Sequence, residues 1–222
     1  MTIITLALPW LFVPPFFGLA LWLLEPITRQ VSLFLNSYHV LPALKPQLAT
    51  LLHYHWLHAA VMTVIAVAPF EGRVFNNMTS ILFIPFIYRL SLTDRLSGWL
   101  PQEFTWSCLT AGLLTAVGSA ELLSAAMTVI ALLLLCGSVW LVSGYYAKRE
   151  LLGLGDVWLT AALGAWLGWP LALFAIGVGL CGFILWHLMS GDVETGGPLG
   201  PWLGHAALLA MIVKVYDPLL MW

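Results

Sequence analysis

The chain has 222 residues, of which 61% are hydrophobic and only 8% are charged, and its formal net charge is −2. A soluble domain carries about a quarter charged residues, so this composition excludes an ordinary soluble fold. The small negative net charge also argues against a nucleic-acid partner. The apolar runs are long and lack the alternation of barrel strands, which predicts an all-α, polytopic membrane protein with a single membrane-embedded domain over residues 1–222.

Apolar runs separated by charged or turn-forming residues predict about eight transmembrane helices. Their approximate ranges are 3–24, 54–70, 79–93, 104–119, 122–146, 156–169, 171–189 and 202–220. Glu25 and Pro26 are expected to end the first helix, because proline disrupts a helix interior. The segment 25–53 then forms a short cytoplasmic loop, which is too small to be an ordinary domain.

The positive charges predict the orientation in the membrane. If the 25–53 loop is cytoplasmic, six of the eight Lys and Arg residues fall on the cytoplasmic side. Cytoplasmic loops collect positive charge, so this choice places the N-terminus outside. The loops at 94–103, 147–155 and 190–201 then lie inside the cell. Lipid is the expected environment of the chain, and its oligomeric state is left open.

A glycine-rich run with one acid, Gly153 to Asp156, precedes an apolar stretch that extends to Trp169. A carboxylate next to a segment this apolar is costly near lipid, so it is a candidate functional group. Gly153 and Gly155 would leave room for another chain to approach it. Asp is also a preferred N-cap residue, so a simple helix cap at Asp156 is the alternative.

The sixth predicted span is unusually short. It runs from Asp156 to Trp169, before Pro170, and gives roughly 20 Å of helix against a hydrocarbon core of roughly 30 Å. We therefore expect either a locally thinned bilayer or a water-accessible notch at Asp156. Such a notch would supply the water that hydrolysis at a membrane requires.

A second acid, Asp94, ends the third predicted span on the same predicted side of the membrane. Taken alone, Asp94 beside Arg95 has the pattern of a solvated loop charge. Taken with Asp156, it predicts two carboxyl groups that can share a proton, as in aspartic proteases. The three cysteines lie far apart and form no CxxC pair, and neither a metal nor a cofactor is expected.

These motifs resemble those of the type IV prepilin peptidases, GxGD aspartyl proteases of bacterial inner membranes. The residues from Gly153 to Trp169 read GLGDVWLTAALGAWLGW, similar to the family block GxGDxKLxAxLGAWLGW. Asp94 is followed seven residues later by Pro101, as in the family's first acidic block, and Gly200 and Pro201 are similar to the start of a third block. The resemblance covers most of the chain from Asp94 onward.

The resemblance implies a membrane endopeptidase in which two acids act on water. Its implied catalytic residues are Asp94 and Asp156, and the residues expected to shape the site are Gly153, Gly155, Pro101, Gly200 and Pro201. The implied substrate is a prepilin or pseudopilin, a short basic leader followed by a hydrophobic helix, cut after a glycine on the cytoplasmic side. Which of the two acids is the base and which the proton donor stays open.

The chain departs from the family pattern at three places. Trp158 stands where the family usually has Lys, and Gln102 stands where it usually has Asp or Asn. Many members also carry, between the first two spans, a cytosolic domain with paired CxxC motifs, and these members methylate the new N-terminus. The 25–53 segment has no cysteine, which argues against the methyltransferase activity.

Other charged and titratable residues have plainer interpretations. Four acids on the predicted cytoplasmic side are either solvated charges or contacts for the basic leader: Glu103, Glu150, Asp192 and Glu194. His55 and His58 would share a helix face, with His53 pointing elsewhere, which is poor metal geometry and favours an interfacial role. His187 and His205 are isolated in the sequence.

Two alternatives belong to other functional classes. A proton-coupled transporter would also place acids in a membrane protein, but it predicts acids near the bilayer midplane and related halves. An inactive homologue that binds pilins without cutting them is the other alternative, consistent with Trp158 and Gln102. Incubation of the purified protein with a prepilin separates the three interpretations.

Overall fold

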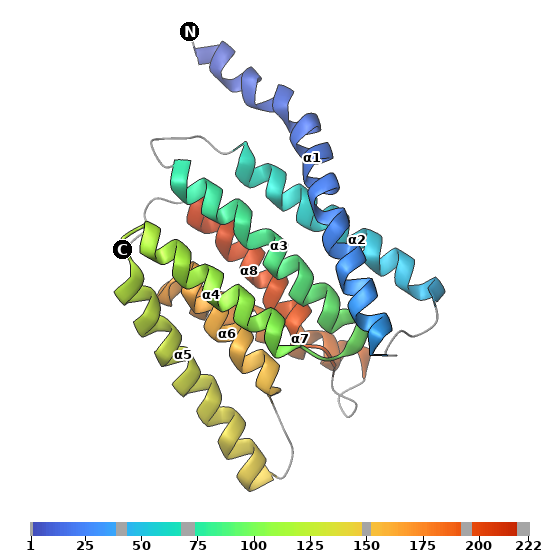
Figure 1. Ribbon diagram of the computed structural model, residues 1–222, viewed down its shortest axis with the longest axis vertical. Helices are drawn as coiled ribbons and strands as arrows, with labels where there is room; N and C mark the ends of the chain where they lie inside the picture. Colours follow the sequence, from blue (N-terminus) through green and yellow to red (C-terminus); the bar gives the residue numbers. More distant parts are fainter. Residues whose placement is uncertain (1, 39–43, 68–73, 148–151, 192–196, 217–222) are drawn as a thin grey trace.

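The computed structural model describes residues 2–38, 44–67, 74–147, 152–191 and 197–216, and within these ranges all regular structure is helical (Figure 1). The predicted all-α class is therefore confirmed. The helices are α1 (Thr2–Ser37), α2 (Leu44–Ala66), α3 (Val74–Ser97), α4 (Gln102–Gly118), α5 (Leu122–Val142), α6 (Leu154–Leu167), α7 (Trp169–Ser190) and α8 (Gly200–Tyr216), with a π-helical turn at Ser143–Ala147.

Three of the described helices are long and apolar enough to cross a membrane. They are Leu11–Ser37 in α1, Leu122–Tyr146 in α5 with the π-helical turn, and Trp169–Ser190 in α7. Little of each apolar segment is buried inside the protein, as expected of helices that face lipid. The chain is thus a membrane protein, and the total of eight spans with an outside N-terminus stays a prediction.

The predicted end of the first helix at Glu25 and Pro26 is wrong, because α1 continues to Ser37. One face of the continuation is apolar, and its residues Leu24, Val31 and Leu35 are at most 1% exposed. Burial of this face against the bundle stabilises the helix by more than the proline costs. The charged residues Glu25 and Arg29 therefore lie on the solvent side of a helix and do not end it.

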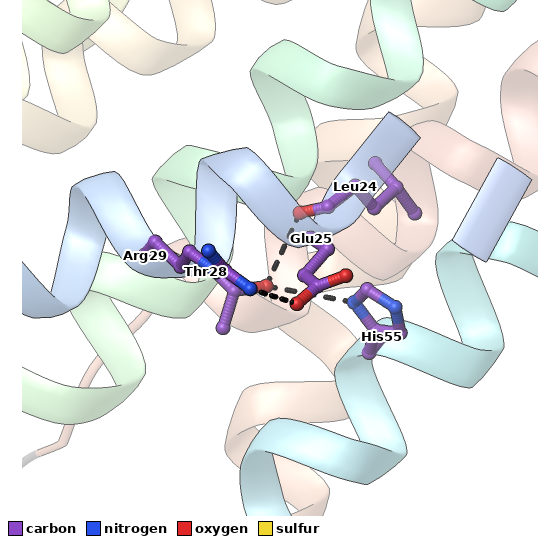
Figure 2. Close-up of polar contacts among 5 residues, drawn as sticks. All are labelled: Leu24, Glu25, Thr28, Arg29 and His55. Carbon is purple, nitrogen blue, oxygen red and sulfur yellow. Dashed lines mark hydrogen bonds and ion pairs between the residues drawn. The ribbon is translucent and has the colours of Figure 1, made fainter. Parts of the chain in front are cut away.

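Ion-pair and hydrogen-bond contacts also stabilise this part of α1. Arg29 forms an ion pair of 2.6 Å with Glu25 one turn earlier, on the exposed side. Thr28 donates to the carbonyl of Leu24 and lies 3.5 Å from Nδ1 of His55 on α2 (Figure 2). Residues 25–37 and 44–53, which were expected to form a loop, are thus helical.

Helix α6 is the most enclosed element of the described structure. Every residue from Leu159 to Leu167 is buried, and α6 packs most extensively against α4 and α5. At its far end, the indole nitrogen of Trp166 donates to the carbonyl of Cys108 on α4 at 2.9 Å, and Lys214 of α8 donates to the carbonyl of Trp166 at 2.7 Å. These contacts fix α6 at both its sides and its end.

Helices α3 and α8 form a second closely packed group together with α7 (Figure 1). The approach of α8 to α3 is close at Gly204, where an added Cβ would overlap the hydroxyl oxygen of Ser91. Phe83 and Phe86 of α3 contact the ring of Trp166 on α6 at 5.4 and 6.0 Å between centroids, and α6 also packs against α7 and α8. The bundle therefore has two helix groups that meet along the α3–α6 boundary.

Candidate active site

Asp94 lies in the last turn of α3, just before Gly98 ends that helix with φ of 66°. Its side chain is only 4% exposed. The backbone amide of Gly200, the first residue of α8, donates a hydrogen bond of 2.8 Å to Oδ2 of Asp94. The expectation of a solvated loop charge is therefore wrong, because the carboxyl group is turned inward against the start of another helix.

Asp156 lies in the first turn of α6, whose N-cap is Gly153. The alternative of an N-cap role for Asp156 is therefore wrong. The carboxyl group of Asp156 lies against Gly153, where an added Cβ would be 3.1 Å from Oδ2, while the other carboxyl oxygen, Oδ1, is buried without a hydrogen-bond partner among the described residues. A buried polar atom without a partner is costly, so it marks a place for a water molecule or a ligand.

Side-chain contacts place the two acids at the same level of the bundle. Phe83 of α3 touches Trp166 of α6 at the end of the pair far from the acids. Asp94 follows Phe83 and Asp156 precedes Trp166 by nearly equal lengths of chain, roughly 15 Å of helix in each case. Since α3 runs from the Phe83 contact toward Asp94 and α6 runs from Asp156 toward Trp166, the two carboxyl groups lie at the same edge.

The two carboxyl groups also interact electrostatically, and both lie outside the three candidate membrane-spanning helices. Burial raises the pKa of Asp94 from 3.8 to about 6, and the hydrogen bond from Gly200 partly offsets this rise. Burial and, to a smaller extent, the nearby charge of Asp94 together raise the pKa of Asp156 from 3.8 to about 7. At neutral pH such a pair favours a state that holds one proton.

Gly155 allows the chain between α3 and α4 to reach the start of α6. A Cβ at position 155 would lie 2.7 Å from the Cβ of Leu100 and 3.0 Å from its carbonyl oxygen. Pro101, which follows, is the N-cap of α4, and its carbonyl accepts hydrogen bonds from Phe104 and Thr105. This packing holds the segment after Asp94 against the helix that carries Asp156.

Of the remaining predicted site residues, some lie within the ranges that the structure describes and others lie outside them. Glu103 is exposed in the first turn of α4, two residues after Pro101. Pro201 is buried at the start of α8, next to Gly200. Three of the predicted leader contacts lie outside the described residues: Glu150, Asp192 and Glu194.

The two departures from the family motifs lie on one side of the site. Trp158 of α6 packs against Trp106 of α4, with 5.3 Å between ring centroids and nearly edge-to-face geometry. Gln102 is exposed at the start of α4. The position of the usual lysine is thus filled by an aromatic contact between α6 and α4.

The sequence did not predict the histidine cluster formed by α2 and α8. His58 is fully buried, so its expected interfacial role is wrong, although it and His55 do share a face against Tyr88. His205 was considered isolated, yet its ring lies 6.3 Å from that of His58. No periodicity links α2 with α8, so only the tertiary fold reveals this cluster.

No three His, Cys, Asp or Glu side chains in the described ranges come close enough together to hold a metal ion. The chemistry that the site offers is acid–base chemistry on water by two carboxyl groups, one ionised and one protonated. The fold and the site together define a membrane-embedded helical protein with a pair of interacting acids, one buried and one half-buried, at one helix boundary.

Comparison with known proteins identifies the family. A model of the Type IV leader peptidase family matches residues 81–216, which include both acids, the GxGD run and Gly200. The chain belongs to this family. The resemblance stated from the motifs is therefore confirmed.

Two relatives are described as prepilin leader peptidase/N-methyltransferase. The one from Pectobacterium carotovorum subsp. carotovorum is 33% identical over 62% of this chain and 52% of its own length. The one from Escherichia coli strain K12 is 31% identical over 69% of this chain and 70% of its own length. A Type 4 prepilin-like proteins leader peptide-processing enzyme from Escherichia coli O78:H11 is 35% identical over 56% of this chain and 47% of its own length.

The chain spans about half the length of two of these three relatives. No solved structure matches the chain significantly.

Proposed function

We propose that the chain is a membrane aspartyl endopeptidase that removes the basic leader from type IV prepilins or pseudopilins. Family membership and the names of the relatives support a leader-processing activity. The observation that carries the mechanism is the placement of two acids at one edge of the α3–α6 boundary: Asp94 is buried and held by the amide of Gly200, and Asp156 is half-buried with its oxygen Oδ1 unpartnered among the described residues. The methyltransferase activity named in two relatives is not included in this proposal.

In the proposed reaction, a water molecule is held between the two acids. The ionised carboxylate accepts a proton from this water as its oxygen attacks the scissile carbonyl carbon. The protonated carboxyl group donates its proton to the carbonyl oxygen, which gives a neutral tetrahedral intermediate. The intermediate then collapses, the C–N bond breaks, and the leaving nitrogen takes up a proton, so one peptide bond and one water become a carboxyl group and an amine.

The contacts of the two acids favour a particular division of roles. The amide of Gly200 stabilises negative charge on Asp94, so Asp94 is the carboxylate that activates water. Asp156 has the more strongly raised pKa and a buried oxygen without a protein partner, so Asp156 carries the shared proton. The buried unpartnered Oδ1 of Asp156 is also where the attacking water finds a hydrogen bond.

The proposed cellular setting follows from the charge distribution and the family. The charge bias of the sequence predicts that the segments carrying the two acids face the cytoplasm, so cleavage takes place on the cytoplasmic side of the inner membrane. The substrate is cut after a glycine that separates its basic leader from its hydrophobic helix. This site chemistry requires two carboxyl groups and water alone.

The test is cleavage of a purified prepilin by the full chain in detergent. Asp94→Asn and Asp156→Asn should each reduce cleavage at least about 1,000-fold, because either change removes one half of the acid–base pair. Glu25→Gln is the matched control, since Glu25 is exposed and paired only with Arg29 on α1. Normal cleavage by either Asp variant that still accumulates in the membrane would refute the proposed mechanism.

A further inference from the structure

A pocket of about 590 Å³ lies at the end of the bundle next to Asp94, among α2, α3, α7 and α8. Its polar lining includes Arg95 and three histidines, His53, His187 and His205. Its aromatic lining is made by Tyr54, Trp186 and Trp202. The peptidase mechanism uses none of these side chains.

The charge of this pocket suits an anion. Among the described residues that line the pocket there is no carboxylate, and Arg95 has no ion-pair partner in the described part of the chain. The carboxylate of its neighbour Asp94 accepts a hydrogen bond from Gly200 instead. The pocket therefore presents one permanent positive charge and three imidazole rings to whatever enters it.

One polar atom of the pocket lacks a partner. Nε2 of His205 is buried and makes no hydrogen bond with the described residues. Nδ1 of His187 lies 2.9 Å from the carbonyl of Phe183, so that nitrogen carries the proton and donates within its own helix. A bound oxyanion would accept from Nε2 of His205 and from the guanidinium of Arg95, which satisfies both groups.

The position of the pocket points to lipid as the source of the anion. Its α7 wall is the last turn of a candidate membrane-spanning helix, so the pocket opens where that helix leaves the hydrocarbon. Trp186 is 59% exposed there, and its ring lies 6.1 Å from that of Trp202. Tryptophan collects at the level of lipid headgroups.

We infer that this pocket binds the phosphate group of an anionic phospholipid, with Arg95 and His205 as donors and with Trp186 and Trp202 beside the headgroup. Basic pockets between membrane helices on the cytoplasmic side commonly hold anionic headgroups. The bound lipid would lie directly against the helix end that carries Asp94. This inference concerns binding and does not require that the chain cleave anything.

The test is binding by the full chain in neutral detergent. Phosphatidylglycerol, phosphatidylcholine and inorganic phosphate are added separately, and the melting temperature and the lipid retained in native mass spectrometry are measured. Phosphatidylglycerol alone should raise the melting temperature and be retained. Arg95→Gln should weaken its binding about fivefold, the effect of one surface charge on an anionic lipid.

Arg29→Gln is the matched control, because it removes an exposed arginine from another part of the structure and should leave lipid binding unchanged. His205→Phe keeps the ring volume, removes the unpartnered nitrogen and should also weaken binding. Asp156→Asn should retain the lipid even though it abolishes the proposed cleavage, which separates the two proposals.

Three results would overturn the lipid assignment. They are equal stabilisation by phosphatidylcholine, full stabilisation by inorganic phosphate alone, and unchanged phosphatidylglycerol binding in Arg95→Gln. Displacement of the lipid by an acidic peptide at equal concentration would likewise assign the pocket to a protein ligand.

Discussion

The backbone amide of Gly200 and the carboxyl group of Asp94 are joined by a hydrogen bond of 2.8 Å between residues 106 positions apart in the chain. This contact brings the first residue of α8 to the last turn of α3. It also fixes one oxygen of Asp94, so the other oxygen is available for a proton or for water. The position of α8 is thus linked directly to the ionisation of one proposed catalytic acid.

We expect Gly200→Ala to impair cleavage strongly. A Cβ at this position would lie 2.7 Å from Oδ2 and 3.1 Å from Cγ of Asp94, so the carboxyl group must move. A displacement of this size at a reacting group costs about 100-fold in kcat. The measurement is kcat for prepilin cleavage alongside the melting temperature.

Gly137→Ala is the matched control for this substitution. Gly137 lies inside α5, and an added Cβ would meet nothing within 4 Å. Alanine there should leave cleavage unchanged and stabilise the protein by about 0.5–1 kcal/mol. Equal cleavage by Gly200→Ala and Gly137→Ala would show that the contact with Asp94 is unimportant.

We expect Gly155→Ala to impair cleavage, because it would separate the start of α6 from the segment that follows Asp94. The new Cβ would come within 2.7 Å of the Cβ of Leu100 and 3.0 Å of its carbonyl oxygen. Because these atoms are backbone or next to it, truncation by Leu100→Ala should not rescue cleavage in the double variant. Rescue by Leu100→Ala would instead place the conflict in the outer part of the leucine side chain.

We expect both stability and activity to depend on pH through the two acids. Their pKa values rise from 3.8 to about 6 for Asp94 and about 7 for Asp156 on folding, so the folded protein binds more protons than the unfolded chain in this range. The free energy of unfolding should therefore fall as the pH rises from about 4 to about 7 and level off above that. Melting temperatures across this range provide the measurement.

The matched comparison is the double variant Asp94→Asn with Asp156→Asn. It should lose most of this pH dependence, since no buried carboxyl group remains at the boundary. The cleavage rate of the unmodified chain should decline above about pH 7, where the pair loses its single proton. A rate that keeps rising to pH 9 would contradict a proton donor with this raised pKa.

We expect Glu103→Lys to weaken binding of a basic leader. Glu103 is exposed in the first turn of α4, close to the proposed acids. Charge reversal should raise KM roughly threefold at low salt with little change in kcat, and the effect should shrink at high salt. Glu121→Lys, at the opposite end of α4, is the control. A salt-independent change in KM would indicate a structural effect instead.

Long apolar runs without interruptions were predicted well from the sequence. The range expected for α7 differs by at most two residues from the observed helix, and the range 122–146 matches α5 together with the π-helical turn to within one residue, because charged or turn-forming residues bound both runs. The end of α1 was missed for the opposite reason. Glu25, Pro26 and Arg29 suggest an end when each is considered alone, but burial of Leu24, Val31 and Leu35 along one face decides the structure.

The sequence motifs predicted which residues belong to the candidate site. They did not predict how these residues contact one another in the fold. Asp94 and Asp156 were identified from their placement at helix ends, and Gly200 only from the family resemblance. The hydrogen bond from Gly200 to Asp94 depends on how α8 packs on α3, which no local pattern encodes. The same holds for His53, His187 and His205, which come from separate helices to line one pocket.

The division of the bundle into two helix groups affects how loss-of-function substitutions should be interpreted. Asp94 belongs to the group containing α3 and α8, and Asp156 to the group containing α4, α5 and α6. A bulkier residue at Gly204, where α8 approaches Ser91, would tilt α8 without touching either acid. Random mutagenesis should therefore recover alleles without the proposed activity at buried small residues distant from the carboxyl groups, and these alleles would act by misaligning the two helix groups.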